Sequence, residues 1–328
     1  MKLSIRPRRN RQSASIRGLV RETVVSAEDL ILPLFLHEAE ENTPIESMPG
    51  CTRWSIDGLV KEVGEAADVG IQSVVLFPAI DESLKTGNAE ECFNPSGLVP
   101  RAIRAIKAAH PCVTVITDIA LDPYNSAGHD GIVEKDENGE LEILNDETIE
   151  VLCQQALCHA EAGADIVAPS DMMDGRVAAL RAALDCEDFQ KVSIMSYTAK
   201  YASAYYGPFR GALDSAPKAG DKKTYQMDPA NRREAQREAE LDESEGADIL
   251  MVKPAGPYLD IISDLRAASQ LPIAAYQVSG EYLMIKSAAA DGWIDEEKVM
   301  IESLTGIKRA GADMILTYFA KQFAQLKA

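Results

Sequence analysis

Short runs of apolar residues recur along the chain, and the segments between them carry apolar side chains at helical spacing. Such short, continuous runs are typical of strands that are buried on both faces. Three of the runs follow the same local sequence, Gly-Ala-Asp, at residues 163–165, 246–248 and 311–313. Glycine suits the end of a helix, where a positive φ is common. The alternation of helices and buried strands predicts a parallel sheet.

The pattern predicts eight strands, near residues 30–36, 73–79, 113–119, 165–169, 191–197, 248–252, 272–278 and 313–318. Eight parallel strands that alternate with helices can close into a barrel, so the predicted fold is an α/β protein with a (β/α)8 TIM barrel. A doubly wound open sheet is the alternative, but no Gly-x-Gly-x-x-Gly motif follows the first strand.

Three segments interrupt the alternation. Residues 1–28 are polar and rich in arginine, so we expect an extended arm for subunit contacts, followed by a catalytic barrel over 29–328. Residues 131–144 contain Asn-Gly between short alternating runs, which predicts a β-hairpin after the third strand, on the barrel's carboxyl face. Residues 201–227, after the fifth strand, form a long segment without helical periodicity, as expected of an active-site lid.

Composition narrows the class of protein. The chain has 328 residues, of which 46% are hydrophobic, and a net charge of −19. A field of that sign disfavours nucleic acid and anionic membranes, so we expect a small-molecule substrate and a protein partner. The six cysteines include no Cys-x-x-Cys pair, and no apolar stretch follows the basic N-terminal residues. We therefore expect a reduced, cytoplasmic protein without a secretory signal.

Polar residues gather where the predicted strands end, which is where barrel enzymes place their active sites. They are Asp118, Asp122, Ser170, Asp171, Lys200, Lys253, Ser279 and Tyr318. Lys253 and Lys200 end consecutive strands, and neighbouring strands lie about 4.8 Å apart. Burial and like charge would then lower a lysine pKa and supply the neutral amine that Schiff-base chemistry needs. The alternatives are an ion pair with Asp118, or two lysines that bind a phosphate.

The predicted lid adds groups that suit a carboxylate-bearing substrate. Arg210 and Lys222 could bind one carboxylate, with Gln226 nearby, and Ser279 and Tyr318 could hydrogen-bond a second. Two amines and two carboxylate receptors fit a pocket for two similar substrates.

Several longer motifs resemble the porphobilinogen synthases over nearly the whole chain. They lie at residues 6–9, 122–124, 128–131, 169–175, 197–203, 206–210, 251–255 and 276–281. The resemblance implies a hydro-lyase that condenses two 5-aminolevulinate molecules to porphobilinogen, with loss of two waters, in heme and chlorophyll biosynthesis. It also implies a homo-octamer whose subunits exchange their N-terminal arms.

The same resemblance suggests roles for the residues of the first substrate site. Lys253 would form a Schiff base with one 5-aminolevulinate, whose carboxylate would meet Ser279 and Tyr318. Asp118 would transfer protons or orient the lysines.

The second substrate site follows in the same way. Lys200 would hold the second 5-aminolevulinate, whose carboxylate would meet Arg210 and Lys222, with Gln226 closing the lid side. Ser170 and Asp171, in the motif at the fourth strand end, are expected to contact substrate.

The expected metal differs from that of the zinc-dependent members. Their three cysteines fall on Ala120, Asp122 and Asp130 here, so the thiolates of a zinc site are missing. Oxygen ligands favour hard cations, and we expect Mg²⁺, as in the family's aspartate-rich, magnesium-responsive branch. Asp122 and Asp130 would bind the ion, or only orient water or amine. Glu238 corresponds to an allosteric magnesium site, and a solvated helix is the alternative there.

Two other functions remain open. A class I aldolase also uses a barrel and a Schiff-base lysine, although it normally needs one such lysine and a phosphate site. A barrel retained as a binding scaffold would need neither lysine.

Overall fold

The computed structural model describes residues 3–135, 137–139, 141–213 and 217–327. Within these ranges eight parallel strands close into a barrel, because β12 pairs with both β11 and β1. The barrel strands are β1 (Leu30–Leu36), β4 (Ser73–Pro78), β5 (Thr114–Ile119), β8 (Ile166–Pro169), β9 (Ser193–Lys200), β10 (Ile249–Lys253), β11 (Ile273–Gln277) and β12 (Met314–Thr317). The predicted TIM barrel is therefore confirmed, with every strand near its expected position.

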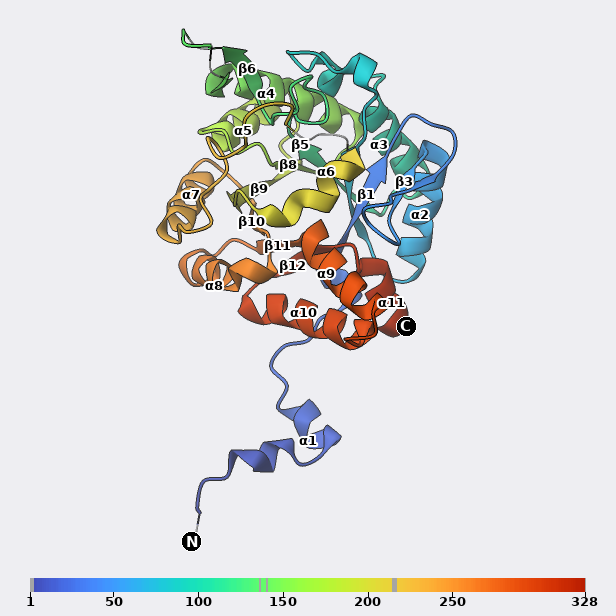
Figure 1. Cartoon of the computed structure of the whole chain (residues 1–328), viewed down its shortest axis with the longest axis vertical. Coiled ribbons are helices and arrows are strands. Elements are labelled where there is room, and N and C mark those ends of the chain that lie inside the picture. Colours follow the sequence, from blue (N-terminus) through green and yellow to red (C-terminus); the bar gives the residue numbers. More distant parts are fainter. Residues whose placement is uncertain (1–2, 136, 140, 214–216, 328) are drawn as a thin grey trace.

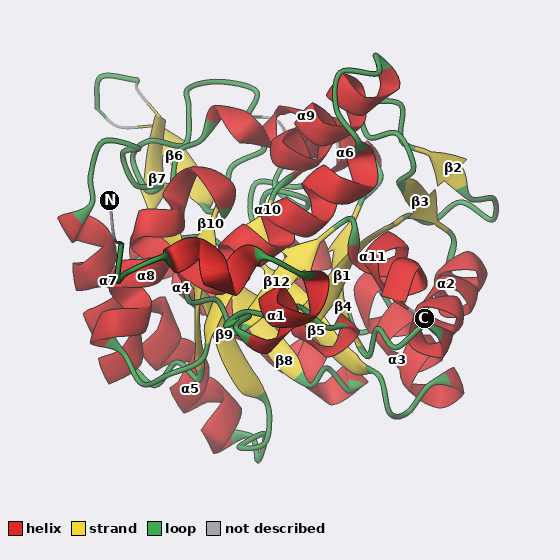
Figure 2. Ribbon diagram, turned by 90° about the horizontal axis from the view of Figure 1, so that it is seen from below, coloured by secondary structure: helices red, strands yellow, loops and turns green. Residues whose placement is uncertain are grey.

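Helices surround the strands, as the view in Figure 2 shows. Those that follow the barrel strands are α2 (Ile56–Asp68), α3 (Leu98–Ala109), α4 (Asn145–Ala162), α5 (Arg176–Cys186), α7 (Arg233–Ser244), α8 (Leu259–Ala268), α10 (Glu296–Ala310) and α11 (Ala320–Lys327). Polar caps define where several of them begin. The Ser55 hydroxyl, for example, accepts a hydrogen bond from the Gly58 amide at the start of α2.

Further elements decorate the barrel. They are α1 (Ala14–Leu19), α6 (Gly207–Leu213), α9 (Ser279–Ala290), the strands β2 (Thr43–Pro44), β3 (Thr52–Trp54), β6 (Ile132–Lys135) and β7 (Leu141–Leu144), and the 3-10 turns η1 (Pro7–Arg11), η2 (Ala27–Asp29), η3 (Glu82–Leu84), η4 (Glu90–Phe93), η5 (Ala204–Tyr206) and η6 (Gly256–Tyr258). The strands β6 and β7 form the predicted hairpin, with Ile132 opposite Leu144.

The Gly-Ala-Asp units fasten the amino-terminal end of the barrel. Each glycine ends a helix or the turn after it with a positive φ, of 107°, 101° and 128° at Gly163, Gly246 and Gly311. Each aspartate then accepts a hydrogen bond from a backbone amide of the neighbouring strand. The pairs are Asp165 with Val115 at 2.7 Å, Asp248 with Ile194 at 2.7 Å and Asp313 with Ile273 at 2.8 Å. The repeat thus stabilises the strand register at the end opposite the active site.

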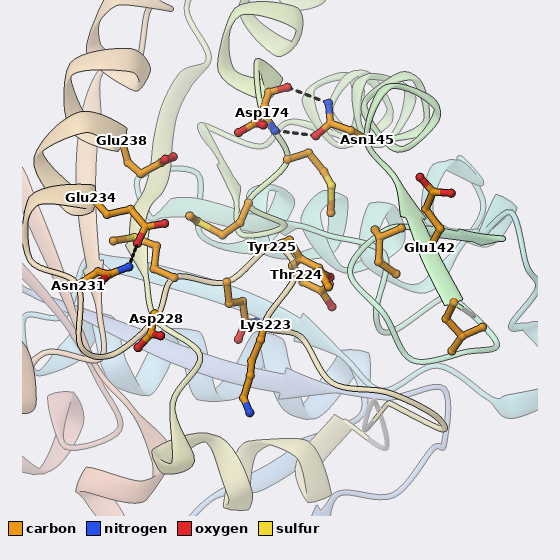
Figure 3. A pocket seen from close by; sticks show the side chains of 16 residues that line it. Glu142, Asn145, Asp174, Lys223, Thr224, Tyr225, Asp228, Asn231, Glu234 and Glu238 are labelled. Atoms are coloured by element: carbon orange, nitrogen blue, oxygen red, sulfur yellow. Dashed lines mark hydrogen bonds between the residues drawn. The ribbon is translucent and has the colours of Figure 1, made fainter. Parts of the chain in front are cut away.

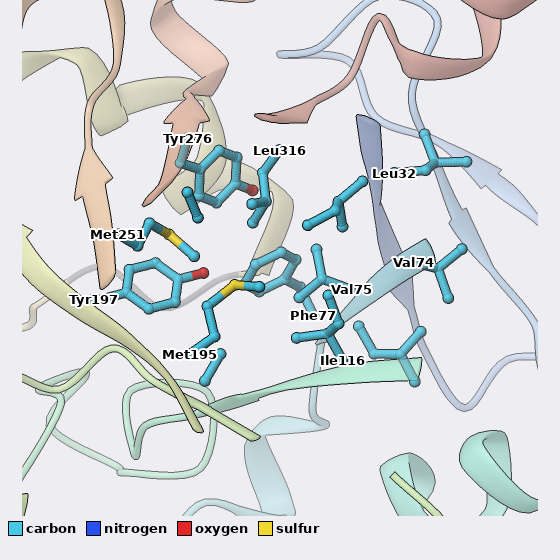
Figure 4. Packing of buried hydrophobic residues seen from close by; sticks show 14 of the residues in the cluster. Leu32, Val74, Val75, Phe77, Ile116, Met195, Tyr197, Met251, Tyr276 and Leu316 are labelled. Atoms are coloured by element: carbon cyan, nitrogen blue, oxygen red, sulfur yellow. The ribbon is translucent and has the colours of Figure 1, made fainter. Parts of the chain in front are cut away.

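Large side chains fill the barrel interior, as Figure 4 shows for Met195, Tyr197, Met251, Tyr276 and Phe77. All five are at most 1% exposed. Because these side chains fill the interior, the site of polar chemistry is expected at the carboxyl ends of the strands.

The N-terminal segment does not pack into the barrel. It extends away from the body of the molecule (Figure 1), and neither η1 nor α1 contains a buried residue. The apolar side chains of Ile5 and Leu19 on this arm are more than 80% exposed.

Candidate active site

Lys200 and Lys253 lie side by side at the carboxyl ends of β9 and β10, where they are partners in the strand register. Both side chains are buried and line one cavity. The register between the two strands shifts, because β9 has one more residue than β10 between the pair Leu250–Ser196 and the pair Val252–Ala199. Simple alternation from Tyr197, which points into the barrel, would turn Lys200 outward. The bulge in β9 brings it to the side of Lys253.

Aromatic rings surround the amine of Lys253. Its Nζ atom lies 4.7 Å from the ring centre of Tyr276, 5.0 Å from Tyr197, 5.1 Å from Phe209 and 5.3 Å from Tyr206. Burial, reinforced by the charge of Lys200, lowers the pKa of Lys253 to about 7. A large fraction of this amine is therefore neutral, and nucleophilic, near neutral pH.

Polar partners surround the amine of Lys200. Its Nζ atom donates a hydrogen bond to the backbone carbonyl of Ser170 and lies 3.6 Å from the carboxylate of Asp130. The two lysines thus share a cavity and differ in their immediate neighbours.

Asp118 lines the same cavity as the two lysines and lies beside both. Burial, reinforced by the charge of Asp122, raises the pKa of Asp118 to about 7, and Lys253 opposes this rise. Its Oδ1 atom has no hydrogen-bond partner among the described residues. A carboxyl group with such a pKa can both accept and donate a proton near neutral pH.

Asp122 and Asp130 contact lysine. The Nζ atom of Lys222 lies 3.4 Å from Asp122 and 3.1 Å from Asp130. Burial would raise the pKa of Asp130, but the ammonium groups of Lys200 and Lys222 outweigh it and hold this pKa below its usual range. The described residues include no group of three histidine, cysteine or acidic side chains that could hold a metal ion. The ammonium groups of Lys200 and Lys222 therefore neutralise these two carboxylates in this structure.

Of the remaining residues predicted for the site, some line the lysine cavity and others lie outside its lining. Ser170 and Gln226 line the cavity with the lysines, whereas Asp171 does not. Asp171 lies behind it, fully buried and 3.7 Å from Arg176, and its Oδ1 atom accepts a hydrogen bond from the Met173 amide. Burial raises the pKa of Asp171 to about 6.

Ser279 lies next to the lid segment, and both Ser279 and Tyr318 lie outside the lining of the lysine cavity. The Ser279 hydroxyl accepts a hydrogen bond from the Phe209 amide at 3.0 Å, and the Tyr318 hydroxyl lies 2.8 Å from that of Tyr276. The side chain of Arg210 falls outside the described part of the structure, as do residues 214–216 of the predicted lid. The cavity measures ≈ 30 Å³, which is too small for two substrate molecules.

Several site residues were missed from the sequence. The rings around Lys253 were not predicted, although Tyr206 and Phe209 lie in a motif of the family resemblance. The contact of His129 with the Tyr225 hydroxyl, at 3.1 Å, also joins the loop after β5 to the lid segment. No local signal announces that pair, since 96 residues separate its members.

Glu238 lies in a second, larger cavity of ≈ 730 Å³ (Figure 3). Its lining is rich in oxygen atoms from α7 and the segment before it, the β6–β7 hairpin, the start of α4 and the segment after β8. They include those of Glu142, Asn145, Asp174, Asp228, Asn231 and Glu234. Burial, aided by neighbouring carboxylates, raises the pKa of Glu238 to about 6, although Arg176 opposes this. Glu238 is thus half-buried on a cavity wall. It does not lie on a fully solvated helix face, which was the alternative from the sequence.

Comparison with known proteins identifies the family. Residues 4–326 match the family described as Delta-aminolevulinic acid dehydratase. The chain is 63% identical to the chloroplastic delta-aminolevulinic acid dehydratase of Glycine max, over 98% of this chain and 77% of that protein. It is 61% identical to enzyme 1 of Arabidopsis thaliana, over 99% and 75% of the two chains. The Toxoplasma gondii enzyme, solved with its product porphobilinogen, superposes with a TM-score of 0.96 at 55% identity, covering 99% of this chain and 92% of that one.

These relatives correct one prediction. The enzymes from Glycine max, Physcomitrium patens, rice and Arabidopsis are all named chloroplastic, so the expected cytoplasmic location is wrong. Cysteine usage reports a reducing environment and cannot tell one such compartment from another. Among the described helices, none is both long and apolar enough to span a bilayer.

The extent of these matches also decides between the functions left open by the sequence, since neither an aldolase nor a binding scaffold explains identity above 60% to dehydratases along almost the whole chain. The chain belongs to the delta-aminolevulinic acid dehydratase family, the porphobilinogen synthases, and condenses two molecules of 5-aminolevulinate to porphobilinogen in tetrapyrrole biosynthesis.

Proposed function

We propose that Lys253 forms the Schiff base with one 5-aminolevulinate while Lys200 binds the second. The observation that carries this proposal is the pairing of the two lysines across β9 and β10 on one buried cavity. Because the pKa of Lys253 lies near 7, its neutral amine is available to attack a ketone. Lys200 is engaged by a carbonyl and a carboxylate, which suits a binding role.

Asp118 is the proposed proton-transfer group of the site. Its raised pKa and its place beside both lysines support this role. Ser170 holds Lys200 through its backbone carbonyl. Asp171 supports that segment from behind, through its contacts with Arg176 and the Met173 amide.

The carboxylates of the two substrates are assigned to opposite sides of the lid. Ser279 and Tyr318 would bind the carboxylate of the first substrate, replacing the contacts that they make with the Phe209 amide and the Tyr276 hydroxyl. Lys222 and Arg210 would bind that of the second, with Gln226 beside them. For Lys222 this means exchanging a protein carboxylate for one of the substrate.

Magnesium is proposed to act at the Glu238 cavity and to leave the lysines untouched. An oxygen-rich lining suits Mg²⁺, which usually keeps several of its waters and needs few protein ligands. When bound there, the ion would neutralise Glu238 and its acidic neighbours. We propose no zinc requirement, because Asp122 and Asp130 are engaged by Lys222.

Assembly into an octamer is proposed from the arm. Exposed apolar residues such as Ile5 and Leu19 on a projecting segment need a partner surface to cover them. Light scattering of the full chain and of a chain without residues 1–28 tests this, and an unchanged number of subunits per particle would refute it. A plastid location is proposed from the chloroplastic relatives.

Borohydride trapping tests the central proposal. Reduction in the presence of 5-aminolevulinate should leave a covalent adduct on Lys253, located by peptide mass spectrometry. An adduct on Lys200 alone, or none while the pyrrole is still formed, would contradict the assignment.

A further inference from the structure

The amine of Lys253 is enclosed by aromatic rings in place of a counter-ion. Four ring centres lie between 4.7 and 5.3 Å from its Nζ atom. Among the described residues, none forms an ion pair or a hydrogen bond with this atom, whereas Lys200 has both. Rings at such distances present their negative π faces to a positive charge.

The four rings belong to different parts of the chain. Tyr197 and Tyr276 project from β9 and β11 into the barrel interior (Figure 4), and each is at most 1% exposed. Tyr206 and Phe209 belong to the lid segment, in η5 and α6. We call these four residues the aromatic enclosure. It is complete only when the lid segment lies against the barrel.

We propose that the aromatic enclosure binds the cationic nitrogen of the Lys253 iminium and thereby makes Lys253 the lysine that holds a lasting adduct. This inference rests on the proposed Schiff base. In that step the neutral amine of Lys253 adds to the C4 ketone carbon of 5-aminolevulinate. The resulting carbinolamine takes up one proton and loses one water, which leaves the positive charge on the C=N group.

The rings favour the iminium over the ammonium for a physical reason. An ammonium is a compact, strongly hydrated charge, and burial therefore penalises it heavily. An iminium spreads its charge over nitrogen and carbon and has a single N–H, so it loses less hydration on burial. Aromatic cages bind such bulky, weakly hydrated cations, as they do quaternary ammonium groups. The enclosure therefore lowers the free energy of the adduct relative to that of the protonated lysine.

Tyr197 offers the sharpest test. Its hydroxyl is buried and has no hydrogen-bond partner among the described residues, so Tyr197→Phe removes no hydrogen bond that the structure contains. Phenylalanines that carry one, two or three fluorines can then be placed at position 197. Fluorine withdraws electrons from the π face and changes the ring size little.

The probe is 4-oxopentanoate, which has the skeleton of the substrate without its amine and so stops at the iminium. Equilibrium occupancy is measured by borohydride reduction and intact mass spectrometry. We expect the equilibrium constant for adduct formation to fall stepwise with fluorination, by roughly fivefold over the series. A constant that does not change from the first to the last analogue would overturn the proposal.

Phe35 provides the matched control. It is equally buried and packs against Phe209 and Tyr318, with ring centres 5.6 and 5.8 Å apart, but it does not face the Nζ atom of Lys253. The same fluorinated series at position 35 should lower the equilibrium constant much less than the series at position 197, and an equal fall at both positions would assign the effect to packing. If the unsubstituted enzyme gives no adduct on Lys253, the proposed function itself fails, which is a separate outcome.

Discussion

The two lysines at the mouth of the barrel come from neighbouring strands and are buried to the same extent, yet their surroundings differ. Lys200 contacts a carbonyl oxygen and a carboxylate, which hold a charged amine in place. Lys253 contacts ring faces, and burial has lowered its pKa to about 7. Position on the barrel brings both amines to one cavity, and under the proposed mechanism the neighbours of each decide which of them becomes the nucleophile.

The difference extends to the segments that close over each lysine. On the Lys253 side, the lid contributes rings and a backbone amide that donates to Ser279. On the Lys200 side, it contributes Lys222, which pairs with Asp122 and Asp130. One half of the cavity is therefore apolar and suited to covalent chemistry, while the other is ionic and suited to binding a charged substrate.

Removing each lysine in turn is expected to have the largest effect. Lys253→Ala should abolish borohydride trapping and lower pyrrole formation by roughly 10³-fold or more, because the covalent step is lost. Lys200→Ala should lower pyrrole formation severely as well, yet keep the adduct with 4-oxopentanoate on Lys253. The colorimetric pyrrole assay and peptide mass spectrometry measure the two effects. Trapping lost equally in both variants would break the distinction between the lysines.

The charge of Lys200 should also control the pH dependence of Lys253. That charge is one cause of the lowered pKa, so Lys200→Met should raise the pKa of Lys253 and reduce its neutral fraction at pH 7. The rate of adduct formation with 4-oxopentanoate should then rise at higher pH than in the original protein, and the rate at pH 7 should fall about fivefold to tenfold. Lys223→Met, at an exposed lysine, is the control. A pH–rate profile of Lys200→Met that matches that of the original protein, or lies at lower pH, would contradict the effect of the Lys200 charge on the pKa of Lys253.

Much of the fold could be predicted from the sequence because its signals are local. The Gly-Ala-Asp units and the apolar runs each lie within a few residues, and they located all the barrel strands. The inward direction of the Lys253 side chain follows directly from the alternation of side chains along β10. The approach of Lys200 depends on a bulge in β9, and the residues there, Ser196 to Ala199, include no glycine that would signal it.

What could not be predicted depends on contacts between distant segments. The rings of Tyr206 and Phe209 reach Lys253 only through the packing of the lid on the barrel. Asp171 follows a strand end like the other site residues, but the buried Arg176 draws it away from the cavity. Asp122 and Asp130 have the oxygen atoms of a metal site, and only the structure brings Lys222 between them.

The ionic half of the cavity can be tested by comparing two adjacent lysines. Lys222 is buried against Asp122 and Asp130, whereas Lys223 is exposed and pairs, among the described residues, with Asp221. Lys222→Met should remove the Lys222 charge from beside two buried carboxylates and raise KM for 5-aminolevulinate about fivefold to tenfold, with a smaller change in kcat. Lys223→Met should leave both constants nearly unchanged, because exposed ion pairs contribute little. Equal effects of the two substitutions would argue against a substrate-binding role for Lys222.

The smallest expected effect on activity comes from removing metal from the Glu238 cavity, which contains neither Lys200 nor Lys253. If Mg²⁺ acts there, removal of metal by EDTA should lower activity by only about twofold to threefold, because neither lysine contacts the Glu238 cavity. Mg²⁺ should restore the loss, and zinc should not be needed. Glu238→Gln should abolish the response to Mg²⁺ and the heat of Mg²⁺ binding in calorimetry, while Glu240→Gln, on the exposed face of the same helix, should keep both. Activity that requires stoichiometric zinc, or the same Mg²⁺ response in both variants, would show that the cation acts elsewhere.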